Sequence, residues 1–280
     1  MHNISRQEFS SWLLSSSILV VLVVFATGST VFALGAQATR ALTPRQLEIE
    51  KQQQRLASVS EEERRDAVMR LGAMRLAAAS RVCLTALADP SPIVRAVAAH
   101  AILALGPEES ASALIPILND NDEFVRREVA YSLGQTRSRR ATAPLNERLL
   151  SDKEDGVRAA AAIALGEIAD EAAVVVLATV LSPQPSAQRK EKRKRKDERN
   201  PFVLRAIAAA LGRIRSRAGV PALLTALANE GLPGDVRREA ARALGLIGDP
   251  VAVPALRTAS SAEDPYLARI AHESLRKITP

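Results

Sequence analysis

The chain has 280 residues and a formal net charge of +7; 47% of its residues are hydrophobic, but only 3% are aromatic. A core built mainly from Ala, Leu and Val disfavours a β-sandwich, in which aromatic and β-branched residues lead, and favours thin, closely packed helices. The lone cysteine, Cys83, excludes an internal disulfide, and its apolar neighbours predict a buried structural thiol.

An uncharged segment dominates the first forty residues. No charged residue occurs between Phe9 and Thr39, and the window from Trp12 to Leu34 is long enough to cross a bilayer. We therefore expect residues 1–40 to form a transmembrane or signal helix.

Two alternatives remain open for this segment. A cleaved secretory signal would use the small-residue pattern Ala36-Gln37-Ala38 and would leave a periplasmic or secreted protein. An uncleaved anchor would give a single N-terminal membrane pass, which is the localisation we expect. Four basic residues follow the segment within 20 residues, whereas only Arg6 and the amino terminus precede it. That bias would hold the rest of an anchored chain in the cytoplasm.

Residues 41–59 follow as a predicted helical linker or cap, because Thr43-Pro44 is a favourable helix start. Beyond them, residues 60–280 repeat one template: Val-Arg, a small apolar patch, then Leu-Gly. The first residue of the Val-Arg position falls at Glu63, Val94, Val125, Val157, Val203, Val236 and Leu267. The intervals are 31, 31, 32, 46, 33 and 31 residues. Such a period predicts a stack of small repeated units.

Each unit is predicted to contain two helices. The first begins near an acidic residue suited to an N-cap, at Asp89, Asp122, Asp155, Asp235 or Asp264. It is predicted to stop at a glycine C-cap, at Gly134, Gly166, Gly212 or Gly245. The second helix is short and apolar, with a proline in its first turn at Pro116, Pro144, Pro221 or Pro254. One pair cannot bury its apolar face, but stacked pairs cover one another.

Two stretches show a family resemblance: "VRREAARALGLIGDPVAVPAL" (Val236 to Leu256) and "GVRAAAAIALGEIAD" (Gly156 to Asp170). They resemble the short HEAT repeats of the phycobilisome-lyase-like family. The resemblance implies an all-α fold, a right-handed α-solenoid of stacked helix pairs, with an inner, concave face built by the second helices. It also implies a structural ladder in which arginines pair with acidic residues in turns; the ladder residues would be Arg95, Arg126, Arg158 and Arg237.

The 46-residue interval contains a basic insertion at residues 183–199. Between Arg189 and Arg199 there are eight Lys or Arg and three Asp or Glu, a net charge of +5. One alternative is a solvated loop without a partner. The other is a contact for an anionic surface, through Arg189, Lys190, Lys192, Arg193, Lys194, Arg195 and Lys196.

Anionic membrane lipid fits such a contact best in a tethered protein, because clustered basic residues near a membrane add binding energy. Nucleic acid is the weaker alternative and requires the repeats to face the cytoplasm. No aromatic residue interleaves with the basic ones, so nothing indicates base stacking.

The sequence contains little that indicates catalysis. It lacks a His-Glu-x-x-His motif, paired-Cys zinc spacing, a Walker A loop and a Gly-x-Ser-x-Gly elbow. Deoxyhypusine hydroxylase, also a HEAT-repeat protein, binds two irons through several His-Glu pairs, whereas this chain has one, His272-Glu273. A single pair cannot hold two metals. We predict no catalytic residue, no metal site and no cofactor; a lyase-like or hydroxylase-like enzyme is the distant alternative.

The predicted function is a non-catalytic scaffold or adaptor for protein–protein interaction, tethered to the membrane or exported across it. We expect its protein partner to bind the concave face over several repeats. Candidate contact residues on the second helices follow from position alone and are Arg81, Glu147, Arg148 and Arg257.

Overall fold

The computed structural model describes residues 42–182 and 200–279, and these build only helices and the turns between them. The first helices of the seven repeats are α2 (Glu61–Ala73), α4 (Pro92–Ala101), α6 (Glu123–Thr136), α8 (Asp155–Ile168), α11 (Pro201–Ile214), α13 (Gly234–Ile247) and α15 (Pro265–Ile278). The second helices are α3 (Ala77–Cys83), α5 (Pro107–Leu114), α7 (Thr142–Ser151), α9 (Val174–Leu181), α12 (Val220–Ala228) and α14 (Val253–Ala259).

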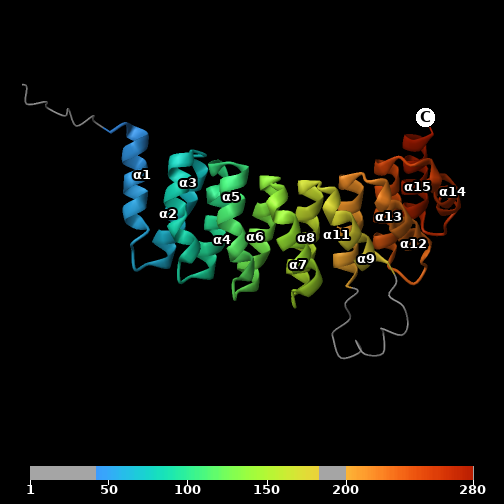
Figure 1. The fold of residues 1–280 in the computed structure, drawn as a ribbon, viewed down its shortest axis with the longest axis horizontal. Helices are drawn as coiled ribbons and strands as arrows, with labels where there is room; N and C mark the ends of the chain where they lie inside the picture. Colours follow the sequence, from blue (N-terminus) through green and yellow to red (C-terminus); the bar gives the residue numbers. More distant parts are fainter. Residues whose placement is uncertain (1–41, 183–199, 280) are drawn as a thin grey trace, which may run out of the picture. The chain divides into compact units, whose positions relative to one another are not determined.

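Short 3₁₀ turns extend or precede the second helices. They are η1 (Thr85–Ala88), η3 (Ile115–Asn119), η4 (Arg139–Ala141), η5 (Glu171–Ala173), η7 (Arg217–Gly219) and η8 (Pro250–Ala252), whereas η2 (Ile102–Leu105) continues α4. The pairs stack in sequence order, and each first helix packs against the first helix of the next repeat (Figure 1). The predicted all-α repeat solenoid is therefore confirmed.

The helix α1 (Pro44–Arg55) precedes the first repeat. Thr43 is its N-cap: the Thr43 side chain accepts a hydrogen bond from the backbone of Gln46, and the Gln46 side chain accepts one from the backbone of Thr43. The helix contacts α2 and α3, so it covers the open end of the stack.

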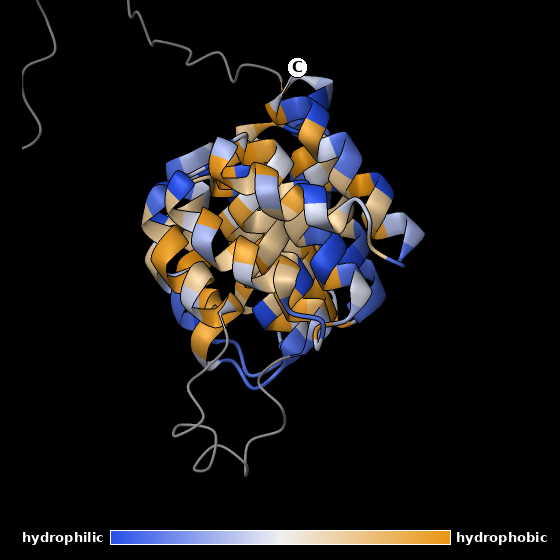
Figure 2. Cartoon of the chain, turned by 90° about the vertical axis from the view of Figure 1, so that its right-hand side faces the viewer, coloured by the Kyte–Doolittle hydropathy of each residue, from blue (hydrophilic) through white to orange (hydrophobic). Residues whose placement is uncertain are grey.

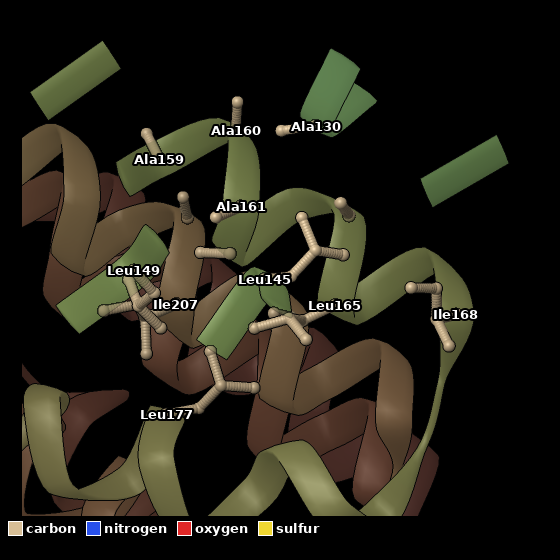
Figure 3. Packing of buried hydrophobic residues seen from close by; sticks show 14 of the residues in the cluster. Ala130, Leu145, Leu149, Ala159, Ala160, Ala161, Leu165, Ile168, Leu177 and Ile207 are labelled. Carbon is tan, nitrogen blue, oxygen red and sulfur yellow. The ribbon is translucent and has the colours of Figure 1, made fainter. Parts of the chain in front are cut away.

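Leucine and alanine form one continuous core between the two layers. Figure 3 shows its central part, where Leu145 and Leu149 of α7 and Leu177 of α9 lie near the alanine-rich helix α8 and Ile207 of α11. All four of these large side chains are fully buried. In Figure 2, tan and orange segments fill the centre of the stack, and blue segments lie toward its periphery. The small alanines allow close helix contact, and the leucines fill the space between the layers.

The glycines have a different role from the predicted one. Helices α6, α8, α11 and α13 continue for two residues past Gly134, Gly166, Gly212 and Gly245, so the prediction of glycine C-caps was wrong. Each glycine instead touches the next first helix. A Cβ added at Gly166 would lie 2.8 Å from Cα of Ala210, and one at Gly212 would lie 2.9 Å from Cα of Ala243.

The true C-caps lie three residues after the predicted ones. Arg137, Ala169, Arg215 and Gly248 there adopt the left-handed conformation that ends a helix. At the other end of the helices, Asp122 and Asp264 are N-caps as predicted. Asp155 and Asp235 lie just inside their helices, and Ser91 takes the N-cap position after Asp89.

The predicted anchor at residues 1–40 and the basic residues between 183 and 199 lie outside the described residues. Within residues 42–182 and 200–279, no helix is both long enough and apolar enough to span a membrane.

Candidate functional site

A ladder of buried and half-buried ion pairs links the first four repeats. Three arginines at the same register each donate from Nε and Nη2 to both carboxylate oxygens of an aspartate one repeat later, at 2.7–3.0 Å. Such two-pronged contacts are the strongest geometry available to a guanidinium and a carboxylate. The pairs are Arg64–Asp89, Arg95–Asp120 and Arg126–Asp152.

The third guanidinium nitrogen of each arginine binds the loop before its own helix. For Arg126, Nη1 donates to the carbonyl oxygens of Asp120 at 2.9 Å and Asn121 at 3.2 Å. Arg64 and Arg95 make the same two contacts in their own repeats. Each arginine therefore joins two successive loops, and the ladder fixes the spacing of the repeats along one edge.

Burial and hydrogen bonding oppose each other at the ladder aspartates. Burial raises the pKa of Asp89 and Asp120, but hydrogen bonds from the paired arginine and from a backbone N–H two residues later outweigh it. The net pKa of both carboxyls is lowered, so both are ionised at neutral pH. The hydrogen bond to Asp120 likewise raises the pKa of Arg95. The innermost pair is Arg126–Asp152, whose side chains are only 6% and 2% exposed.

The ladder changes in the second half of the chain. Arg158 donates to Asp155 of its own helix at 3.0 Å and to the carbonyl of Leu149 at 3.2 Å. Arg237 donates to the carbonyl of Leu227 at 3.0 Å, and the described residues place no carboxylate within ion-pair distance of it. Among the predicted ladder residues, Arg95 and Arg126 thus reach aspartates of the following loop. The loop that follows the Arg158 repeat lies outside the described residues. Sequence analysis missed Arg64, although its 25-residue spacing from Asp89 matches that of Arg95 and Asp120.

The charged candidates on the second helices do not form a cluster. Arg81 contacts Glu109 of the next repeat at 3.4 Å, with both side chains about half exposed. Glu147 and Arg148 pair with each other at 2.7 Å, and Arg148 is mostly covered. Arg257 is exposed on α14. These residues are spread over α3, α7 and α14, so they offer no concentrated charge to a ligand.

Three large apolar side chains are exposed in the second-helix layer. Val175 on α9 is 72% exposed and Leu150 on α7 is 57% exposed, and Val251 beside α14 is 66% exposed. Helices α9 and α12 contain no charged residue. The exposure of these side chains was not predicted from the sequence. Val174 is buried and its neighbour Val175 is exposed, and the rotation of the helix about its axis determines which of the two faces solvent.

One polar cluster lies among the first helices. His100 Nε2 is 3.1 Å from a carboxylate oxygen of Glu128, and His100 Nδ1 is 3.1 Å from the hydroxyl of Ser132. The connectivity resembles a nucleophile triad, but Ser132 is fully buried, so a substrate cannot reach its hydroxyl. The cluster therefore connects α4 to α6.

The remaining reactive groups are isolated. Cys83 is buried, and burial raises the pKa of its thiol to about 12, so it is a poor nucleophile. His272 is exposed on α15. In the part of the chain that the structure describes, no group of three or more His, Cys, Asp or Glu side chains could hold a metal ion.

The repeat architecture has a recognised counterpart. A family model for HEAT repeats matches residues 49–134, 111–192 and 194–276, which together make up most of the chain. The chain belongs to the HEAT-repeat family. The HEAT-repeat prediction is therefore confirmed. No curated protein sequence matches the chain.

Several solved structures are similar to this chain. The complex of CpcE and CpcF of phycocyanin lyase from Nostoc sp. PCC7120 is 23% identical, with 90% of this chain and 94% of that chain covered and a TM-score of 0.49. Human deoxyhypusine hydroxylase in complex with glycerol is 22% identical, with 82% and 84% covered and a TM-score of 0.41. A designed armadillo repeat protein is 16% identical, with 82% and 99% covered and a TM-score of 0.39. These similarities concern the fold alone.

Proposed function

We propose that this HEAT-repeat chain is a non-catalytic scaffold that binds a protein partner across the exposed face of its second helices. Its family membership supports this proposal, since stacked helical repeats present extended surfaces used for binding. The observation that carries it is the exposure of three apolar side chains in the second-helix layer, Leu150, Val175 and Val251. Covering one such side chain contributes roughly 1.5–3 kcal/mol, so a few of them suffice for a specific contact.

The test is a pair of matched substitutions in the full chain. Val175→Glu places a charge on the second-helix surface, and His272→Glu places one on the exposed side of α15 in the other layer. We expect a partner isolated with the wild-type chain to be lost from Val175→Glu and retained by His272→Glu, with unchanged helicity by circular dichroism. Equal partner recovery from both variants would contradict the proposed surface.

The proposal also includes a membrane tether and a second contact. We infer a single N-terminal membrane pass from the uncharged segment within residues 1–40, and an anionic-lipid contact from the +5 run between Arg189 and Arg199. Binding to vesicles containing phosphatidylserine should fall steeply with added salt and disappear when residues 189–199 are deleted. Unchanged binding after the deletion would reduce the run to a solvated loop.

The enzyme alternative has its own test. Two of the similar folds belong to a lyase and a hydroxylase, by their names, but this chain has a single His-Glu pair at His272-Glu273. A hydroxylase of that kind would copurify with iron, and a bilin lyase would bind a tetrapyrrole. Metal analysis and a visible spectrum of the purified chain therefore distinguish a scaffold from both.

A further inference from the structure

A hollow lies on the first-helix layer, where α2, α4 and α6 follow one another (Figure 1). Its volume is about 620 Å³, within the range of small-molecule binding sites. The walls are mostly apolar and come from Val68, Met69, Ala73, Val97, Leu103 and Ala104. Three polar side chains also line it: Arg75, His100 and Gln135.

The hollow coincides with a break in the repeat pattern. Nine residues after the Val-Arg position, five repeats carry a glycine that touches the next first helix, as Gly72 touches Ala101. The second repeat carries Leu103 instead. The last turn of its first helix is also the 3₁₀ turn η2 rather than α-helix. Leu103 and Ala104 of this turn line the hollow and are called its floor below.

The walls on both sides of this floor are held in place. Gly72 allows α2 to approach α4 closely, since a Cβ there would lie 2.9 Å from Cβ of Ala101. On the other side, His100 bridges to Glu128 and Ser132 of α6. A departure from the repeat that is supported by specific polar contacts indicates a feature with a role of its own.

Arg75 supplies a permanent charge at this hollow. Its side chain is exposed and makes no hydrogen bond or ion pair with the described residues. Its φ is +51°, the left-handed range that Arg137, Ala169, Arg215 and Gly248 adopt at the same register in other repeats. The hollow thus combines an apolar floor with a free cation and no lining carboxylate.

We propose that this hollow binds a small amphiphile with an apolar body and one carboxylate group. The body covers Met69, Val97 and Leu103, and the carboxylate pairs with Arg75. This site lies on the layer opposite to the proposed partner surface, so it is independent of the scaffold function.

The three methionines offer a local probe. Met69 lines the hollow and is 54% exposed, Met74 packs against the core, and Met1 is the first residue. The full chain is labelled with ¹³C-methyl methionine and titrated with hexanoate. We expect a saturable shift of the Met69 signal alone, with a dissociation constant on the order of 1 mM for so small a ligand. Met69→Leu assigns the signal.

Two controls separate a carboxylate site from a surface depression. Hexan-1-ol should bind at least tenfold more weakly than hexanoate. Arg75→Gln should weaken hexanoate binding at least fivefold, whereas Arg215→Gln, at the same left-handed register four repeats along, should leave it unchanged. Equal binding of the alcohol, equal loss in both variants, or no saturable shift would each overturn the proposal.

Discussion

Removing Arg126 tests whether the ladder holds the stack together. The change is Arg126→Leu, which leaves the carboxylate of Asp152 buried without its partner. Arg126 makes two hydrogen bonds to Asp152 and two to loop carbonyls, all between 2.8 and 3.2 Å. Breaking a buried pair by removing one member costs roughly 3–5 kcal/mol of unfolding free energy.

The matched control is Arg237→Leu at the same register. Among the described residues, the Arg237 side chain makes one hydrogen bond, to the carbonyl of Leu227. Leucine already occupies this register at Leu204. Losing the Arg237 hydrogen bond should cost about 1 kcal/mol of unfolding free energy or less. The comparison is needed because both changes remove the same side chain from the same place in the repeat.

The assay is thermal and urea unfolding of residues 42–280, followed by circular dichroism. At about 2–4 °C per kcal/mol for a unit of this size, Arg126→Leu should lower Tm by roughly 10 °C. Arg237→Leu should lower it by less than about 4 °C. Equal shifts in the two variants would refute the argument that the two-loop contacts stabilise the stack.

Three further predictions concern packing, pH and the thiol. Gly166→Ala should cost about 1–3 kcal/mol of unfolding free energy, because the new Cβ would meet Cα of Ala210 at 2.8 Å. Gly156→Ala in the same helix would meet only the flexible side chain of Arg127, at 3.8 Å or more, and should be neutral or stabilising in the same melts. The lowered pKa values of Asp89 and Asp120 stabilise the fold above their unfolded pKa of about 3.9, and this contribution is lost as pH falls through the lower folded values. The Asp89→Asn/Asp120→Asn variant should therefore show a flatter loss of Tm between about pH 5 and pH 2, and an unchanged slope would count against the assignment. Because burial raises the pKa of Cys83 to about 12, iodoacetamide should alkylate it at pH 8 only in urea, and rapid labelling of the native chain would contradict its burial.

The repeat register was predictable because its determinants are local. The period of about 31 residues places each Val-Arg position at the start of a first helix, and Asp122 and Asp264 cap helices because an N-cap needs only its own neighbours. The stacking of pairs follows from the apolar face that each pair must cover.

Features that depend on the next repeat were harder to predict. The glycines suggested helix ends, but their role comes from contact with a residue about thirty positions away, as between Gly134 and Ala164. Whether a ladder arginine pairs with a carboxylate depends on the residue about 25 positions later in the chain. That residue is Asp120 for Arg95, but it is Ala262 for Arg237. The hollow beside Leu103 needed three helices in place before it could be seen.

The most direct test of the scaffold is site-specific photocrosslinking in cells. A benzophenone amino acid is placed in the full chain at Val175 or Thr225 on the second helices, or at His272 on α15; all three positions are exposed. The account predicts the same partner adduct from positions 175 and 225 and no adduct from position 272. Adducts confined to position 272, or none from 175 and 225 when a partner copurifies, would contradict it.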